Sequence, residues 1–332
     1  MKISTAFLGL ALSVPLVFSL LPGATAQSYN FTDFDASGSG LNTTVNGISN
    51  SGVVVGYYLN TDGTVTNYSG TPPMFDPLNL SGVAAANGIN SSGQVVGSDG
   101  NGGAFLLDSN GLTTLPLVDS TETSQQAFGI SDQGVIVGQF TRSDKVSTSG
   151  FVGKGSSFSP IGPKDSVSTF AQGINNNGLV VGYYGTAADK GVATHGFLFD
   201  TKTSAYTLLP DPAVSGLTLT QFLGINDSGE AVGYYQVGEN AQYGFLFDTN
   251  TNFYTFLNEP NAQTGDATVT QITGITNTGE IAGFYVDANN AQLGFTALPA
   301  AVPEASSVVS LSLLLLLGVG GLWAAKRRTT AN

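Results

Sequence analysis

Hydrophobic residues in this chain fall into short runs of strand length, separated by polar turns. In one stretch, an alternating segment at 217–226 leads into a polar tetrad at 226–229, and a nearly continuous apolar run follows at 230–235. Alternation is typical of a half-buried strand, and a polar tetrad ending in glycine is typical of a tight hairpin. A continuous apolar run suits a strand that is covered on both faces. The pattern predicts an antiparallel hairpin.

This hairpin pattern occurs six times. Each copy spans twelve residues, with glycine at the first, sixth and tenth places and isoleucine at the second. The copies begin 41, 41, 44, 51 and 50 residues apart, at 47–58, 88–99, 129–140, 173–184, 224–235 and 274–285. A period in this range indicates one supersecondary unit repeated along the chain.

Two further strand-like segments follow each hairpin. A third apolar segment lies at 103–108, 150–154, 196–200, 244–248 and 294–298, with a poorer version at 73–76. A fourth follows a short polar turn, at 112–117, 158–162, 206–209 and 254–257. Four short antiparallel strands per repeat, six times over, predict an all-β fold, a six-bladed β-propeller of four-stranded blades.

The two ends of the repeat region predict how this propeller closes. The last copy finishes at 294–300 without a fourth strand, whereas the early segment 29–35 resembles the fourth strand at 254–260. We therefore expect the N-terminal strand to complete the last blade. A closed ring leaves fewer exposed edges than an open solenoid, which would need capping ends.

The repeated glycines have two expected roles. The sixth-place glycines should adopt the left-handed conformation of the turn. They are Gly52, Gly93, Gly134, Gly178, Gly229 and Gly279. The first-place and tenth-place glycines lie within strands, where glycine costs about 0.5–1 kcal/mol relative to alanine. For both places we expect a close approach of neighbouring sheets near the axis.

The first 26 residues have the form of a secretory signal peptide. Lys2 gives a positive start, residues 6–22 are apolar, and Ala24 and Ala26 form a small-x-small cleavage site. The alternative is a membrane-spanning first helix, which Pro15, Pro22 and Gly23 would interrupt. The mature chain is expected to begin near Gln27 after signal peptidase has acted.

The last 31 residues, 302–332, also have the form of a targeting segment. Residues 308–325 carry no charge and are about long enough to cross a bilayer, and a basic cluster follows. The motif residues are Val302, Pro303 and Glu304, and the cluster is Lys326, Arg327 and Arg328.

This tail resembles the PEP-CTERM sorting signal of bacterial exosortase substrates, although Ala305 stands where that family usually has a second proline. The resemblance implies transient membrane anchoring, processing by an exosortase-type enzyme and delivery to the cell surface or medium. An ordinary single-pass anchor is the alternative. Both interpretations place the repeat domain, 27–301, outside the cytoplasm.

Charge narrows the choice of partner. Without the two end segments the chain keeps 6 of its 10 basic and 22 of its 23 acidic residues, so 6 minus 22 gives a net charge near −16. An anionic repeat domain is repelled by the phosphate backbone of nucleic acids, which argues against a nucleic-acid partner. The chain has no cysteine, so it is expected to fold without disulfides even though export is also expected.

The repeat itself also has a family resemblance. The phrase G-I-N-x-x-G-x-V-V-G-Y, followed by His195, Gly196 and Phe197, resembles the HAF family of extracellular repeats. The resemblance covers nearly all of the exported body. It implies an exported β-repeat protein and carries no catalytic residues to this chain.

Few residues suggest chemistry. His195 is the only histidine, so a transition-metal site is not expected. Acids in the turns, such as Asp132 and Asp227, do not recur from copy to copy, which favours turn formation over a Ca²⁺ loop. The sequence predicts no bound metal or cofactor.

Paired tyrosines are the main candidates for ligand contact. Successive side chains on a strand face opposite ways, so one ring of each pair can pack in the core while the other reaches a surface and stacks on sugar. The pairs are Tyr57 with Tyr58, Tyr183 with Tyr184, and Tyr234 with Tyr235.

These observations favour a non-enzymatic exported protein of the cell surface or extracellular matrix. The PEP-CTERM resemblance implies that this protein is associated with exopolysaccharide or biofilm. The alternative is a carbohydrate-active enzyme, a polysaccharide lyase or hydrolase. Its carboxylates would be pairs such as Asp33 with Asp35 or Asp227 with Glu230. A weaker third hypothesis is a Ca²⁺-stabilised adhesin.

Overall fold

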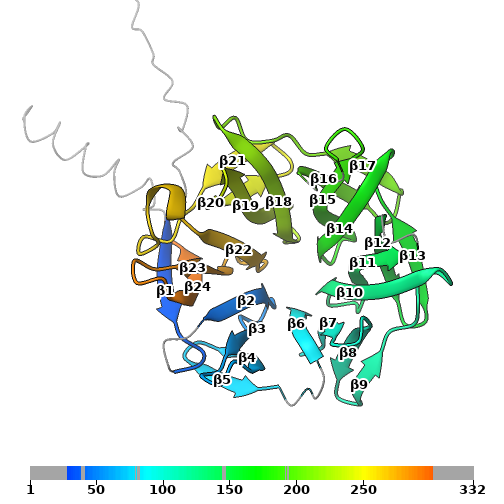
Figure 1. Cartoon of the computed structure of the whole chain (residues 1–332), viewed down its shortest axis with the longest axis horizontal. Helices are drawn as coiled ribbons and strands as arrows, with labels where there is room; N and C mark the ends of the chain where they lie inside the picture. Colours follow the sequence, from blue (N-terminus) through cyan, green and yellow to red (C-terminus); the bar gives the residue numbers. More distant parts are fainter. Residues whose placement is uncertain are drawn as a thin grey trace, which may run out of the picture.

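The computed structural model describes residues 28–301, except 39–41, 79, 81–82, 144–146, 191 and 193. This part of the chain forms 24 strands and one short 3-10 helix, η1 (Gly265–Ala267). Small sheets of mostly antiparallel strands surround a common axis, with β2, β6, β10, β14, β18 and β22 innermost (Figure 1). The fold is therefore all-β and propeller-like, as the sequence predicts.

Four sheets have four strands each. The first contains β2 (Thr43–Ile48), β3 (Val54–Leu59), β4 (Val65–Thr71) and β5 (Met74–Pro77). The second contains β6 (Val83–Ile89), β7 (Val95–Asp99), β8 (Ala104–Asp108) and β9 (Gly111–Thr114). Another contains β18 (Leu217–Ile225), β19 (Glu230–Val237), β20 (Ala241–Asp248) and β21 (Phe253–Phe256). The last contains β22 (Thr270–Ile275), β23 (Ile281–Val286), β24 (Gln292–Pro299) and β1 (Tyr29–Phe34).

The third and fourth repeats share one eight-stranded sheet. Its strands are β10 (Glu122–Ile130), β11 (Ile136–Arg142), β12 (Thr148–Lys154), β13 (Ser157–Ile161), β14 (Ser166–Ile174), β15 (Leu179–Thr186), β16 (His195–Asp200) and β17 (Ala205–Leu208). The structure thus shows four separate four-stranded blades, not the six that the sequence predicts. The reason is a parallel pairing of Thr148 with Ser168, which joins β12 to β14.

The N-terminal strand closes the ring, as predicted. β1 pairs antiparallel with β24 over six residues, from Tyr29 opposite Pro299 to Phe34 opposite Gly294. Phe34 packs in a core cluster with Val45 and Val54 of the first sheet and with Ala282 of the last. The earliest and latest parts of the described chain therefore hold the first and last sheets together.

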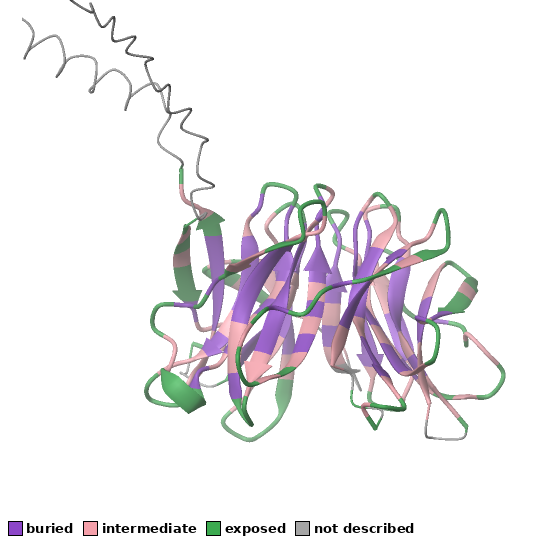
Figure 2. Cartoon of the chain, turned by 90° about the horizontal axis from the view of Figure 1, so that it is seen from above, coloured by how far each residue is buried: buried purple, intermediate pink, exposed green. Residues whose placement is uncertain are grey.

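The core lies between neighbouring repeats. One cluster joins Val137 of the third repeat to Ala171 and Phe197 of the fourth, and all three side chains are fully buried. Buried positions run along the inner strands, whereas outer strands and connecting loops are more exposed (Figure 2). Each repeat thus buries its apolar faces against the next, as repeated units of this size must.

The six hairpin turns have the expected geometry. In each one the N–H of the sixth-place glycine donates to the carbonyl of the first tetrad residue, at 2.9–3.2 Å. All six glycines have positive φ, between 75° and 85°. A side chain in this conformation would strain the backbone.

The glycines within the strands are needed for two different reasons, whereas the sequence suggests a single reason for both places. A Cβ on first-place Gly173 would lie 2.8 Å from the carbonyl oxygen of Leu223 in the next sheet, which is the expected close approach. A Cβ on tenth-place Gly182 would instead collide with the carbonyl oxygen of Phe170 in the same hairpin. The register of β14 on β15 shifts just beyond this point, between Ala171 and Gly173. For the tenth place, the expectation of contact between sheets is wrong.

The two predicted targeting segments lie outside the described residues. These are the signal peptide, 1–26, with Ala24 and Ala26, and the sorting segment, 302–332, with its motif and basic cluster. Within the described ranges, no helix has the length and apolar character needed to span a membrane.

Candidate functional site: an uncharged cavity on the axis

A cavity of about 440 Å³ lies on the axis and is lined by 16 residues. They occupy three equivalent positions of the repeat, two before the pattern and one at its eleventh place. Three residues before the first glycine stand Thr44, Gln126, Phe170, Gln221 and Gln271. One residue before it stand Asn46, Asn87, Phe128, Gln172, Leu223 and Thr273. The eleventh place gives Tyr57, Gln139, Tyr183, Tyr234 and Phe284.

Strand register explains why these positions converge. The residue three before the first glycine is directly opposite the eleventh-place residue in the hairpin, as in Gln126 opposite Gln139 and Phe170 opposite Tyr183. Directly opposed residues project from the same face of a sheet. Each hairpin therefore presents a cross-strand pair to the axis.

The second repeat is the exception. Its pair is Ala85 opposite Ser98, and neither residue lines the cavity. Both side chains here are small, whereas each other repeat has a glutamine or an aromatic residue in at least one of the two positions. At these two positions the second repeat therefore contributes no side chain to the cavity lining, and only its Asn87 takes part.

The tyrosine pairs face opposite ways, as predicted. Tyr183 lines the cavity, whereas its neighbour Tyr184 belongs to a core cluster. Tyr234 and Tyr235 divide in the same way. Among the candidates from the sequence, one ring of each pair is thus placed where a ligand could stack on it.

Aromatic rings and amides hold one another in place around the cavity. The rings of Phe170 and Tyr183 stack at 4.9 Å with an interplanar angle of 17°. Tyr234 donates its hydroxyl hydrogen to Gln221 Oε1 at 2.7 Å. Gln139 Nε2 donates to Gln126 Oε1, also at 2.7 Å, while Gln139 Oε1 is buried without a hydrogen-bond partner. A buried acceptor without a partner requires an explanation, and an occupant of the cavity would reach this one only after the Gln139 amide turns.

The cavity is electrically neutral. None of its 16 lining residues, all in the described part of the chain, is Asp, Glu, Lys, Arg or His. Burial raises the pKa of Tyr234 to about 12, and burial, with Tyr234 nearby, also raises the pKa of Tyr183. Both phenols therefore stay protonated at neutral pH. The lining offers hydrogen bonds and ring faces, but no carboxylate for acid–base catalysis.

Toward the hairpin turns the cavity continues as a narrow channel of about 90 Å³. The two spaces share the six residues that precede the first glycines, so they lie on one axis. Beyond those residues, the channel is lined largely by the first-place glycines, the isoleucines and the polar tetrads.

A chain of hydrogen bonds surrounds this narrow end. The backbone N–H at the second tetrad place of one repeat donates to the side-chain oxygen at the same place of the next. These bonds run from Ser91 to Asp132 (2.8 Å), Asp132 to Asn176 (2.9 Å), Asn176 to Asp227 (2.7 Å), Asp227 to Asn277 (2.9 Å) and Asn277 to Asn50 (2.8 Å). Asn50 passes over the short Ser91 and donates from Nδ2 to Asp132 Oδ2 at 3.2 Å.

The turn acids therefore link repeats. Burial alone would raise the pKa of Asp132, but hydrogen bonds from Ser91, Asn176 and Asn50 outweigh it and lower the pKa. Sequence reasoning treats these acids as local turn formers and misses the links between repeats. A signal was present, because Asp and Asn interchange at this place and both carry an oxygen acceptor. Within the described ranges, no group of three or more acids, histidines or cysteines could hold a metal ion.

The other suggested carboxylates lie off the cavity lining. Asp33 Oδ2 accepts from the Tyr285 hydroxyl at 3.1 Å, and Asp35 Oδ1 accepts from the Ser37 N–H at 2.9 Å. Glu230 Oε2 accepts from Asn226 Nδ2 at 2.7 Å. Asp227 stands at the narrow end of the channel. The structure brings none of these acids into the 440 Å³ cavity.

His195 also lies off the cavity lining. Its Nε2 is 3.5 Å from Asp189 Oδ1, and its Nδ1 is 3.5 Å from Asp211 Oδ2. Its ring packs 5.7 Å from that of Tyr184, measured between centroids. Sequence reasoning did not find this pair of acids beside the histidine.

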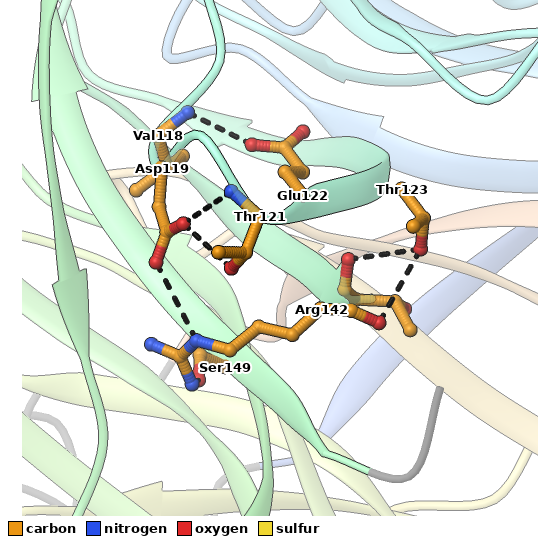
Figure 3. Close-up of polar contacts among 8 residues, drawn as sticks. Val118, Asp119, Thr121, Glu122, Thr123, Arg142 and Ser149 are labelled. Atoms are coloured by element: carbon orange, nitrogen blue, oxygen red, sulfur yellow. Dashed lines mark hydrogen bonds and ion pairs between the residues drawn. The ribbon is translucent and has the colours of Figure 1, made fainter. Parts of the chain in front are cut away.

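A polar cluster at the start of β10 contains a second pair of carboxylates (Figure 3). Asp119 Oδ2 lies 3.6 Å from Arg142 Nε, and hydrogen bonds from Thr121, followed by the ion pair with Arg142, lower the pKa of Asp119. Glu122 Oε2 accepts from the Val118 N–H at 2.8 Å, whereas its Oε1 is buried without a partner. Burial raises the pKa of Glu122.

Comparison with known proteins identifies a family. The model of a family described as "Protein of unknown function (DUF3466)" matches residues 104–293. No curated protein sequence is significantly similar to the chain.

Several solved structures resemble the chain at low identity. A lectin of Aleuria aurantia, in complex with Fucalpha1-6GlcNAc, has 11% identity and a TM-score of 0.46 over 80% of this chain and 98% of the lectin. An oligogalacturonate lyase from Vibrio parahaemolyticus has 12% identity and a TM-score of 0.42 over 85% and 100%. TolB from Acinetobacter baumannii has 12% identity and a TM-score of 0.47 over 76% and 65%. At such identities the likeness concerns the fold alone.

Proposed function

The chain belongs to the DUF3466 family of proteins of unknown function, and we propose that it is an exported, non-enzymatic protein of the cell surface or matrix that binds exopolysaccharide. The predicted signal peptide, 1–26, and the predicted sorting segment, 302–332, support export. The resemblance of the tail to a PEP-CTERM signal supports association with exopolysaccharide.

The axial cavity carries the binding part of this proposal. Its volume of about 440 Å³ falls within the range of small-molecule sites, about 300–1,000 Å³. Glutamine and asparagine side chains offer donors and acceptors that match sugar hydroxyls, and tyrosine and phenylalanine offer apolar ring faces. The lining combines both kinds of group and contains no charge.

Retention on the cell's own polysaccharide tests the binding. Protein purified from its own cells, in its exported form, should be retained by immobilised host exopolysaccharide at physiological salt. Because the cavity is uncharged, retention should change little as the salt concentration rises. Absence of retention at both low and physiological salt would contradict the proposed function.

Mass spectrometry of the same material tests the export. We expect a mature N-terminus near Gln27 and a C-terminus upstream of the 308–325 segment, after processing by signal peptidase and an exosortase-type enzyme. A retained 308–325 segment would favour the ordinary membrane anchor instead. A retained 1–26 segment would contradict cleavage of a signal peptide.

We also propose that the eight-stranded sheet works as two blades, which gives a six-bladed propeller. The support is that all six repeats contribute to the same axial cavity and that the two halves are joined by one parallel pairing. A crystal structure in which several residue pairs connect β12 to β14 would contradict this.

A carbohydrate-active enzyme, a lyase or hydrolase, is the second candidate. One observation favours it: the pKa values of neighbouring Asp119 and Glu122 are shifted in opposite directions, as in acid–base pairs. Glycan cleavage by the wild type that Glu122→Gln abolishes would support an enzyme. Full binding without cleavage across a glycan panel would support the binding protein.

A further inference from the structure

We infer that the axial cavity takes the end of a neutral sugar chain, which enters from the side away from the hairpin turns and stops at the narrow channel. This inference rests on the proposed function and names the class of ligand and its direction of entry. The absence of charge in the lining, the small volume of the channel and the lining of the third and fourth repeats carry it.

Charge selects neutral sugars. A uronate or sulfated sugar would enter a site that has no cation among its lining residues. It would also approach a body whose net charge is near −16, with Asp132 and Asp227 at the far end of the channel. Desolvating an anion without a charged partner is costly, whereas hydroxyl groups can exchange water for glutamine and tyrosine partners.

Channel width sets the mode of entry. A water molecule needs at least about 10–15 Å³ of accessible volume, so the 90 Å³ channel holds a few waters and has no room for a row of sugar rings. Its walls cannot widen easily, because the hydrogen bonds between tetrads hold neighbouring repeats together at this end. A polysaccharide therefore cannot thread through the protein. Only a chain end can occupy the wide cavity.

The third and fourth repeats give the cavity a preferred side, because they place an amide pair beside a ring stack. Strand β11, which carries Gln139, packs against β14, which carries Phe170, and Gln139 Oε1 lacks a hydrogen-bond partner. On the fourth repeat, the Phe170–Tyr183 stack offers a ring face. A sugar lying on that face can direct a hydroxyl or acetamido N–H toward Gln139.

Titration calorimetry with defined oligosaccharides tests the inference. The probes are linear hexasaccharides of glucose, mannose and N-acetylglucosamine, with hexagalacturonate as the anionic probe of equal length. At least one neutral hexasaccharide should bind with one protein per chain, and a longer chain of the same sugar should keep that ratio. Hexagalacturonate should bind at least about tenfold more weakly.

Variants locate the site. Tyr183→Ala and Gln139→Leu should each weaken binding by about tenfold, since they remove a ring face and an acceptor. Phe253→Ala is the matched control, because Phe253 is 63% exposed on outer strand β21 and lies off the cavity lining. Tyr183→Phe should keep the stack and most of the affinity. Melting temperatures check that each variant is folded.

The remaining outcomes either overturn the inference or separate it from the proposed function. Equal binding of hexagalacturonate, several proteins bound along one long chain, or unchanged binding by both cavity variants would overturn the inference. If host exopolysaccharide retains the protein but no neutral hexasaccharide binds, the inference fails and the proposed function stands. If a hexasaccharide binds but host exopolysaccharide does not retain the protein, the inference stands and the proposed function fails.

Discussion

At the scale of single residues, one repeated residue type serves three separate purposes. Sixth-place glycines provide a left-handed turn, first-place glycines allow one sheet to approach the next, and tenth-place glycines make room for a carbonyl in their own hairpin. The first two reasons follow from the sequence pattern. The third does not, because the opposing Phe170 carbonyl is set by a register shift that no spacing reveals.

Gly182→Ala tests the third reason. Its Cβ would meet the Phe170 carbonyl oxygen, which belongs to backbone and cannot rotate away. We expect a loss of roughly 3 kcal/mol or more in the free energy of unfolding, measured by denaturant titration. Gly63→Ala is the control, since it has positive φ but open space around it and should cost about 1–2 kcal/mol. Equal losses in the two variants would refute the contact.

The tetrad residues make a second prediction at this scale. Asn226 is 2% exposed, donates to Thr276 O of the next repeat at 3.1 Å, and accepts from two N–H groups of its own turn. In the equivalent place, the Ser49 hydroxyl bonds within its own turn, to the Ser51 hydroxyl and the Val53 N–H. Asn226→Ala should cost about 2–4 kcal/mol in unfolding free energy, and Ser49→Ala about 1 kcal/mol. A larger loss for Ser49→Ala would argue against the link between repeats.

At the scale of elements, the closing strand meets an acidic group. Asn261 Nδ2 donates both to Asp33 Oδ2 on β1, at 3.0 Å, and to Glu259 Oε1, at 3.3 Å. Glu259 is 3% exposed, and burial, followed by the charge of Asp33, raises its pKa to about 7. The closing strand therefore lies beside a buried carboxyl group whose protonated form is favoured by its surroundings.

This carboxyl should make stability depend on pH. In the unfolded chain Glu259 has its ordinary pKa of 4.5, so between about pH 4.5 and 7 the folded protein binds more protons at this group. Its contribution to stability is thus full at low pH and falls as the pH rises through this window. Glu259→Gln should raise unfolding free energy at pH 8 by roughly 1–3 kcal/mol relative to wild type and change it little at pH 4. A Glu259→Gln effect that is the same at both pH values would exclude this titration.

At the scale of the whole molecule, the sequence predicts the ring more completely than the cavity. The likeness of 29–35 to 254–260 correctly predicts that β1 completes the last sheet. Merging of the third and fourth repeats into one sheet could not be foreseen, because it depends on the pairing of Thr148 with Ser168. The cavity escapes notice because its lining positions vary from Gln126 to Phe170, and only curvature of the ring brings them together.

A crystal structure of the exported protein soaked with a neutral hexasaccharide that binds in calorimetry tests the central claim most directly. The account predicts a terminal sugar inside the axial cavity, against the Phe170–Tyr183 stack and within hydrogen-bond distance of Gln139, with the remaining sugars leading outward. Sugar bound on an outer strand or between two sheets, with only water in the cavity, would contradict it.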